Sequence, residues 1–427
     1  MRPAVPGRLA FGREPLDLPP GPFRLDPLLA PPAPEIARSP SGVDEAFDRP
    51  LGSPPIEEIF RGARKVLVVV SDATRSTGAT EFLPSLVGRI QAACRAEISF
   101  IVASGIHRSP TPAEVESILG TELAGRHRTI LHDPDRGSSL CEVGRTRAGT
   151  PVRVHSALRE HDRIVLTGAA AFHYYAGFSG GRKALVPGLA ARETVTRNHL
   201  RALRRDGSRH PAASAGRLHG NPVHRDMVEG AAMIEPDLLV NSVLDEGGRV
   251  ERLFVGHWRR AHEAACRFVR SRRTVRVDRR DLVVASAGGD PSDINLIQSH
   301  KAFDAGVRAL RPGGVFILVA ACPEGAGHAD FLPWFRFDSE DAWVRALRDD
   351  FQVYGQTALA WFRKTLAYKT ILVSRLDPKM VARLNARPAA DLEEAFRLAR
   401  EELPAGTPGW LISQGGRILP DPVKDSI

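Results

Sequence analysis

The sequence contains few cysteines and no long apolar segment. Its four cysteines are far apart and form no Cys-x-x-Cys pair, which argues against a zinc ribbon, an iron–sulfur cluster or a disulfide scaffold and favours a reducing compartment. An apolar stretch of about 18 residues, which a membrane-spanning helix requires, is absent. The first 26 residues are rich in proline and carry charges, unlike a secretory signal peptide. We therefore expect a cytoplasmic protein that does not enter a membrane.

Lysine is also scarce, since only 7 of the 59 basic residues are lysines. Arginine stays charged in proteins and cannot replace a nucleophilic amine, so the lysines inside polar motifs, Lys183 and Lys301, become candidates for chemistry. The net charge of +9 suits an anionic substrate or a phosphorylated cofactor. The arginines are dispersed and lack interleaved aromatic residues, so we expect no nucleic-acid partner.

Familiar metal and nucleotide motifs are missing too. The sequence has no His-Glu-x-x-His, and no Gly-x-Gly-x-x-Gly follows its first expected strand. The glycines before Lys183 do not have the spacing of a Walker A loop. These absences argue against a zincin metalloprotease, a dinucleotide-binding fingerprint and a P-loop nucleotidase.

At 427 residues, of which 43% are hydrophobic, the chain is long enough for two or three domains. Short apolar runs rich in valine alternate with helical patterns, which is typical of buried parallel strands. We expect such strands at residues 66–70, 98–103, 164–167, 282–285, 315–319 and 370–373. The pattern predicts an α/β fold of two α/β domains with mainly parallel sheets and an active site in the cleft between them.

Composition also suggests where the domains lie. We place an N-terminal, cofactor-binding domain at residues 1–275, with an extended, proline-rich lead-in at 1–60 that contains one strand near Leu9 to Leu18. A C-terminal domain at 276–405 is expected to contribute substrate contacts. Residues 406–427 are expected to form a tail that returns to the N-terminal domain.

Polar clusters follow three of the expected strands. Asp72 and Arg75 follow the first strand, His107 follows the second, and the run His173 to Lys183 follows the third. Ligands of open parallel sheets bind beyond the carboxyl ends of the strands, so neighbouring strands would bring these clusters together. Each residue also has a structural alternative, because Asp72 could be a helix N-cap and the histidines could be satisfied loop residues.

The run from Phe172 to Lys183 combines an imidazole, three glycines, a hydroxyl and an amine. Such a loop can bring backbone N–H groups close to a phosphate, and the amine of Lys183 can bind that phosphate or form a covalent bond. His173, and His199 further along, can ligate a metal or transfer protons.

Taken together, these segments resemble the lactate racemase family of nickel-pincer enzymes. The matching pieces, in order, are Gly52-Ser53-Pro54-Pro55, Ser71-Asp72-Ala73-Thr74-Arg75, Gly105-Ile106-His107-Arg108, the run His173 to Lys183 with Pro187-Gly188, Asn198-His199, Gly220-Asn221-Pro222 and Gln298-Ser299-His300-Lys301. Their order and spacing agree from about residue 8 to residue 425.

The resemblance implies an isomerase, a racemase or epimerase of a lactate-like 2-hydroxy acid. It implies nickel held in a pyridinium-3,5-bisthiocarboxylate mononucleotide, which cofactor-maturation proteins supply. The implied site residues are His107 and His173 as acid/bases, Lys183 as the covalent attachment point, His199 as a nickel ligand, Asp72, Ser179, Gly180 and Gly181 as cofactor contacts, and Arg75, Gln298 and Lys301 as substrate contacts.

These residue types suit hydride transfer. The α-hydrogen of a 2-hydroxy acid leaves more easily as hydride when a base removes the hydroxyl proton at the same time, and the planar keto acid can take hydride back on either face. A racemase therefore needs an acid/base on each side, and a hydride acceptor that no side chain provides. Arg and Lys can hold the carboxylate.

Three departures from the family pattern bear on the substrate. Ser76 and Phe172 stand where the family often has proline, and Ile297 stands where an aromatic residue can occur. The last change alters pocket shape, and related enzymes act on malate, phenyllactate, longer 2-hydroxy acids and sugar acids. Two alternatives stay open: a non-catalytic protein that stores the nickel nucleotide, and a zinc hydrolase that uses His107, His173 and His199.

Overall fold

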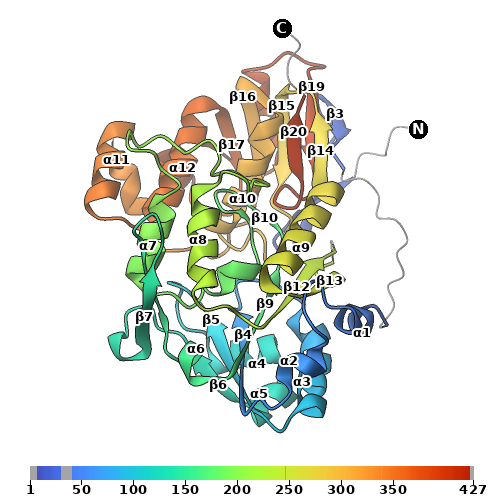
Figure 1. Cartoon of the computed structure of the whole chain (residues 1–427). Coiled ribbons are helices and arrows are strands. Elements are labelled where there is room, and N and C mark those ends of the chain that lie inside the picture. The colour runs from blue at the N-terminus through green and yellow to red at the C-terminus, as the bar shows by residue number, and fades with distance from the viewer. Residues whose placement is uncertain (1–6, 30–40, 246, 338, 424–427) are drawn as a thin grey trace. The chain divides into compact units, whose positions relative to one another are not determined.

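A computed structural model describes residues 7–29, 41–245, 247–337 and 339–423. The chain divides into two compact units. Unit 1 contains the described residues of Met1–Pro32 together with those of Arg272–Ile427, and unit 2 contains the described residues of Ala33–Ser271. Both units are α/β structures with a six-stranded, mainly parallel sheet (Figure 1), as predicted.

The sheet of unit 2 has the strand order β13-β12-β9-β4-β5-β6. Its strands are β4 (Lys65–Ser71), β5 (Glu97–Ala103), β6 (Arg128–Leu131), β9 (Arg163–Ala169), β12 (Leu238–Leu244) and β13 (Val250–Gly256). Only β13 pairs antiparallel with its neighbour within this sheet. The apolar run of β4 is buried along almost its whole length, because helices or loops cover both faces of a central parallel strand.

Helices on one face of this sheet form its main core. Apolar side chains of α1 (Ser41–Asp48), α2 (Ile56–Phe60), α3 (Ala79–Ala93), α4 (Pro112–Leu119) and α5 (Thr121–Arg126) pack against β4 and β5. The other elements of unit 2 are β7 (Leu140–Arg145), β8 (Pro151–His155), α6 (Ala157–Glu160), β10 (Phe172–His173), β11 (Gly177–Phe178), α7 (Arg192–Leu200), α8 (Pro222–Ala232) and α9 (Trp258–Arg273).

The sheet of unit 1 is parallel throughout, in the order β18-β17-β16-β15-β19-β3. Its strands are β3 (Arg24–Pro27), β15 (Arg280–Ser286), β16 (Leu310–Val319), β17 (Lys369–Val373), β18 (Arg387–Ala389) and β19 (Pro408–Ile412). The helices are α10 (Leu296–Gly306), α11 (Glu340–Asp349), α12 (Val353–Ala367), α13 (Pro378–Arg383) and α14 (Leu392–Arg400). Two separate apolar cores cover the two faces.

Both ends of the chain differ from the sequence-based domain assignment. The segment before residue 30 supplies β3 to the sheet of unit 1, beside β19. The tail after residue 406 supplies β19 itself and β20 (Leu419–Pro422), which pairs with β14 (Thr274–Val277). These pairings join residues more than 100 positions apart in the chain, so local patterns could not reveal them.

The expected strand near Leu9 to Leu18 is a hairpin. β1 (Arg8–Phe11) and β2 (Glu14–Asp17) pair antiparallel around a turn at Gly12, whose φ is +60°. Only glycine adopts that conformation freely. The inward side chains of Leu9 and Phe11 are buried in one of the cores of unit 1.

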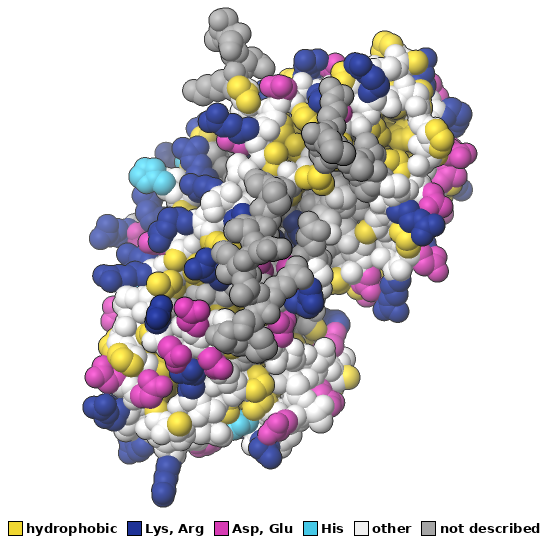
Figure 2. Space-filling model, turned by 90° about the vertical axis from the view of Figure 1, so that its right-hand side faces the viewer, with side chains coloured by type: hydrophobic (Ala, Val, Ile, Leu, Met, Phe, Trp, Pro, Cys, Tyr) yellow, Lys and Arg dark blue, Asp and Glu magenta, His cyan; other side chains and the backbone are white. Residues whose placement is uncertain are grey.

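No helix in the described part of the chain is both long and apolar enough to span a membrane. On the face drawn in Figure 2, Lys and Arg side chains occur singly or in small groups between acidic, apolar and uncoloured atoms. That scatter agrees with the dispersed arginines of the sequence.

Candidate active site

Three neighbouring strands of unit 2 end at the same edge of the sheet. β4 lies between β5 and β9, and the chain passes from β4 to β5 on one side before it returns to β9 on the other. Such a reversal of strand order leaves a crevice at the carboxyl ends, where α/β proteins bind ligands. Asp72, His107 and His173 follow these three strands, so the predicted convergence has a topological basis.

Asp72 and His107 form a hydrogen-bonded pair. Asp72 Oδ2 lies 2.8 Å from His107 Nδ1, and the other oxygen, Oδ1, accepts the Thr74 N–H at 2.9 Å. Burial alone would raise the pKa of Asp72, but the hydrogen bond with His107, the charge of Arg75 and the hydrogen bond from Thr74 help to lower the pKa from 3.8 to about 2. The carboxylate is therefore ionised at neutral pH and orients the imidazole.

His173 and Lys183 are brought together by the loop after β9. His173 is paired with Gly177 in the β10–β11 hairpin, and the chain then enters a 3₁₀ turn at Gly181–Ala184. His173 Nε2 lies 3.2 Å from Lys183 Nζ, and His173 Nδ1 accepts the Ala176 N–H at 3.3 Å. Lys183 is only 8% exposed, which is rare for a lysine unless its amine is paired.

The glycines of this loop are required by packing. Gly180 and Gly181 have φ of +75° and +55°, and a Cβ at these positions would lie 2.4 Å from Asn241 and 2.6 Å from His262 respectively. The N–H of Gly181 is donated to Asn241 Oδ1, and the N–H of Lys183 is donated to the Gly180 carbonyl. Both N–H groups are thus used inside the protein, and neither is presented to a phosphate as the sequence had suggested.

Ser179 closes the same loop with its hydroxyl. Ser179 Oγ donates to the Ala169 carbonyl at 2.7 Å and accepts the Ala171 N–H at 2.9 Å. Although residues 177–181 match the Gly-x-Ser-x-Gly pattern of hydrolases, this hydroxyl is committed to the backbone. The geometry supports a structural role for the Ser179 side chain, and its predicted cofactor contact stays a prediction.

Arg182 was missed by sequence reasoning, although it lies inside the motif. It is 1% exposed, and its guanidinium donates to the carbonyls of Ala176 and Phe178 and to His262 Nε2, at 2.8 to 2.9 Å. Burial lowers the pKa of Arg182 to about 10, which leaves it charged at neutral pH. An arginine that binds its own loop this way fixes the shape from which Lys183 projects.

Tyr175 links the remaining site residues. Its ring centroid lies 4.6 Å from that of His173 and 5.1 Å from that of His199, and Lys183 Nζ lies 5.7 Å from it. His199, on α7, is 4% exposed. Burial is the largest cause that lowers its pKa to about 3. His199 is therefore a neutral imidazole with a lone pair at neutral pH, as a metal ligand must be.

The motif Gly220-Asn221-Pro222 supports Tyr175 from outside the site. Asn221 caps α8, because its Oδ1 accepts the N–H groups of Val223 and His224. Its Nδ2 donates to the Tyr175 carbonyl at 2.8 Å. The preceding motif residue, Asn198, donates to Asp226 Oδ2 at 3.0 Å and ties α7 to α8.

Two predicted substrate contacts lie in unit 1. Gln298 and Lys301 stand on one face of α10, as their spacing predicted, and Lys301 Nζ donates to Gln298 Oε1 at 2.6 Å. Arg75 is an exposed residue of unit 2 that follows Asp72. The structure thus brings Asp72, Arg75, His107, His173, Lys183 and His199 together in unit 2, and Gln298 with Lys301 in unit 1.

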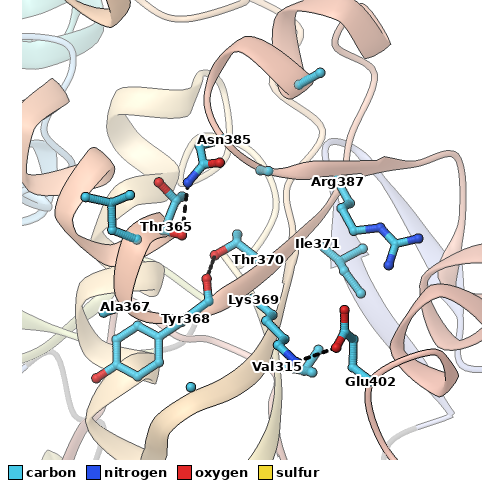
Figure 3. Close-up of a pocket in the computed structure, with 14 residues that line it drawn as sticks. Val315, Thr365, Ala367, Tyr368, Lys369, Thr370, Ile371, Asn385, Arg387 and Glu402 are labelled. Atoms are coloured by element: carbon cyan, nitrogen blue, oxygen red, sulfur yellow. Dashed lines mark hydrogen bonds and ion pairs between the residues drawn. The ribbon is translucent and has the colours of Figure 1, made fainter. Parts of the chain in front are cut away.

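A surface pocket of about 450 Å³ in unit 1 is a poor alternative site. Figure 3 shows Lys369 in an ion pair with Glu402 and Asn385 donating to the Thr365 carbonyl. Lys369 and Arg387 are the first residues of β17 and β18, so the pocket lies at the amino ends of the strands. Ligands of parallel sheets bind at the opposite, carboxyl edge.

Comparisons with known proteins agree on one family. The family profile of the lactate racemase N-terminal domain matches residues 11–210, and that of the lactate racemase C-terminal domain matches residues 275–415. The chain is 30% identical over 364 residues to the lactate racemase of Thermoanaerobacterium thermosaccharolyticum, covering 84% of each protein. It is 29% identical over 370 residues to the lactate racemase of Lactiplantibacillus plantarum, covering 84% of this chain and 85% of that protein.

Solved structures show the same likeness. The lactate racemase apoprotein of T. thermosaccharolyticum superposes with a TM-score of 0.90 and 28% identity, over 97% of this chain and 99% of that chain. A Thermotoga maritima protein superposes with a TM-score of 0.66 and 20% identity, over 88% of this chain and 100% of that chain, and indicates the fold alone.

Proposed function

Because this chain belongs to the lactate racemase family and is therefore an isomerase, we propose that it interconverts the two configurations at C2 of a lactate-like 2-hydroxy acid. The reaction is a reversible hydride transfer assisted by His107 and His173. One observation carries the proposal. Two histidines, a buried lysine and a buried neutral histidine meet at one sheet edge, where the topology leaves a crevice.

The residues present fit the nickel-pincer nucleotide that the family resemblance implies. His199 offers a buried imidazole lone pair, which suits nickel. The Tyr175 ring contacts both His199 and His173, which supports a nickel ligand close to the proposed acid/base. Lys183 presents its amine in the same cluster and would hold the nucleotide covalently, with Asp72 and the Ser179–Gly181 loop nearby. When bound, the nucleotide supplies the hydride acceptor that side chains lack.

The chain's own groups handle the proton and the carboxylate. His107, oriented by Asp72, takes the hydroxyl proton from one enantiomer, and His173 serves the opposite face. Arg75 binds the substrate carboxylate, and Gln298 and Lys301 hold the substrate from α10. The overall positive charge raises the local concentration of the anionic substrate.

The four free cysteines support a reducing cytoplasm as the place of action. The alternative of a storage protein that binds the nickel nucleotide without turnover would need neither histidine. A zinc hydrolase gains no support, because the described residues contain no cluster of three or more His, Cys, Asp or Glu side chains that could hold a metal.

The proposal is tested on protein purified from its own host, with its maturation proteins present. Peptide mass analysis should find a sulfur-containing nucleotide on Lys183, with nickel near one per chain, and a panel of chiral 2-hydroxy acids should reveal interconversion of lactate or a relative. An unmodified Lys183 in active protein would refute the covalent attachment. A modified Lys183 with no turnover of any panel member would favour storage.

A further inference from the structure

The two histidines of the proposed reaction have opposite hydrogen-bond partners at Nδ1. His107 faces an acceptor, the Asp72 carboxylate, whereas His173 faces a donor, the Ala176 N–H. We propose that their resting neutral tautomers are therefore opposite: His107 carries its proton on Nδ1 and offers Nε2 as a proton acceptor, whereas His173 carries its proton on Nε2 and acts there as a donor. We further assign Asn221 as the positioning residue that sets His173. The catalytic meaning of this inference rests on the proposed function, but the tautomers themselves do not.

The assignment for His107 follows from its carboxylate partner. Asp72 is ionised at neutral pH, so it has no proton to donate, and the Nδ1 that faces it at 2.8 Å must be the donor. A neutral imidazole has one N–H, which leaves the lone pair on Nε2. His107 is thus a base without any rearrangement.

The assignment for His173 follows from a backbone donor. The Ala176 N–H points at His173 Nδ1 across 3.3 Å, so that nitrogen is the acceptor and the proton lies on Nε2. The same peptide unit is fixed at its other end, because Asn221 Nδ2 donates to the Tyr175 carbonyl at 2.8 Å. Since a peptide is planar and trans, anchoring that carbonyl also aims the N–H of Ala176 at the ring.

The contact between His173 and Lys183 must agree with this arrangement. If Nε2 is a donor, the amine 3.2 Å away must accept and is uncharged while it does so. An ammonium would instead require a lone pair on Nε2 and an N–H on Nδ1, facing the N–H of Ala176. A backbone amide cannot release its proton, whereas a buried lysine can lose one, so we infer that the amine is the deprotonated group. An uncharged amine is the form of Lys183 that can attack an electrophilic carbon.

The two histidines would then enter the reaction unequally. His107 can remove a hydroxyl proton at once, whereas His173 first acts as a hydrogen-bond donor to oxygen. His173 becomes an acid or a base only after its contact with Ala176 opens. The loaded enzyme should therefore oxidise one enantiomer faster than the other in the first half-turnover.

The direct test is ¹⁵N NMR of the imidazole nitrogens in the unloaded chain, labelled at histidine, near pH 7.5. Assignments come from His→Asn variants. His155 and His257 serve as references, because each accepts a backbone N–H at Nδ1, from Ala157 and Arg259 respectively. We expect His173 to match these references and His107 to show the opposite pair of shifts. Matching tautomers in His107 and His173 would overturn the proposal.

Two variants test the tautomers of His173 and His107 separately. Asn221→Ser keeps a good N-cap residue but removes the donor to the Tyr175 carbonyl, and it should shift His173 alone. Asp72→Asn should shift His107 alone. A third variant, Lys183→Met, should leave the His173 tautomer unchanged, whereas a flip there would show that an ammonium had set it. Equal shifts of both histidines in Asn221→Ser would refute the role of Asn221.

Steady-state kinetics of the same variant test whether the His173 tautomer affects turnover. In the loaded enzyme, Asn221→Ser should lower kcat about tenfold and leave KM within about twofold, since Asn221 is buried and acts through the Tyr175 carbonyl. An unchanged kcat despite a shifted His173 signal would remove Asn221 from the reaction. Absence of racemase activity in the wild type, with the tautomers as expected, would count against the proposed function and leave the hydrogen-bonding inference intact.

Discussion

Both units have a six-stranded, mainly parallel sheet, but they use its carboxyl edge differently. In each sheet an inner strand, β4 or β15, lies between the strand that follows it in the chain and a later strand, β9 or β19. In unit 2 the carboxyl ends carry titratable groups. In unit 1 they hold the N-terminal hairpin: Asp293 Oδ2 accepts the N–H groups of Gly12 and Ala321, and Ser286 Oγ donates to the Ala10 carbonyl. The topology creates the crevice, and the side chains decide whether it serves chemistry or structure.

Two buried lysines, one in each unit, show the same contrast between chemistry and structure. Lys183 and Lys364 are each 8% exposed and each lie beside a histidine Nε2, that of His173 at 3.2 Å and that of His300 at 2.8 Å. Lys364 also has Asp304 at 3.1 Å, an ion pair that joins α12 to α10. In unit 2, Asp72 is hydrogen-bonded to His107.

Replacing each lysine by methionine should have the largest effects, and the two variants should differ in kind. Lys183→Met should reduce racemisation by at least about 10³-fold, because the amine proposed to hold the nucleotide is lost. Lys364→Met should lower that free energy by about 3 to 5 kcal/mol, because Asp304 is left buried without its cation. Chiral assay and urea unfolding of both variants check the pair. Full activity in Lys183→Met would disprove its role.

Removing either acid/base should have the next largest effect. His107→Ala and His173→Ala should each lower the rate by about 10² to 10⁴-fold, while the nucleotide mass stays on Lys183 and nickel stays bound. Intact-protein mass and metal analysis accompany the chiral assay. His300→Ala in unit 1 is the matched control for loss of a buried imidazole, and its nucleotide should also remain. Loss of the nucleotide from both active-site variants would contradict the acid/base assignment.

The charge of Asp72 should make stability depend on pH. Its folded pKa of about 2 lies below the ordinary 3.8, so the carboxylate contributes about 2 kcal/mol to the free energy of unfolding at pH 6. That contribution is lost as the pH falls from about 4 through 2. Urea unfolding of wild type and Asp72→Asn at pH 6, 4 and 3 should show the difference shrinking. Burial raises the pKa of Asp237, so Asp237→Asn should show the opposite trend.

The helix caps should give the smallest effect. Asn221 caps α8 in unit 2 and Asn295 caps α10 in unit 1. Replacement of either by alanine should cost about 1 kcal/mol of stability, measured by urea unfolding. Asn295→Ala should leave the ¹⁵N shifts of His173 unchanged, whereas Asn221→Ala should move them. A change in the ¹⁵N shifts of His173 in Asn295→Ala would show that loss of a helix cap in either unit perturbs this histidine. It would contradict the specific role of Asn221.

The sequence predicted the parts of the molecule that local patterns encode. The valine-rich β4 and β5 and the polar residues that follow them were found, because buried parallel strands are nearly all apolar. The pairing of β3 with β19 was not found, since it depends on contacts far apart in the chain. Within the site, Arg182 and Tyr175 were overlooked because their roles arise from loop carbonyls and ring contacts. Lys364 was overlooked because its partners lie on another helix.

The discontinuous composition of unit 1 has a consequence for synthesis on the ribosome. Every strand of the unit 2 sheet lies between residues 65 and 256, so this sheet can form while the later part of the chain is still being translated. β3 must wait for β19, its partner from Pro408 onward, which at bacterial or eukaryotic elongation rates is a delay of roughly 20 to 80 seconds. The unit that carries the histidines and Lys183 is thus complete on the nascent chain before the sheet of its neighbour can close.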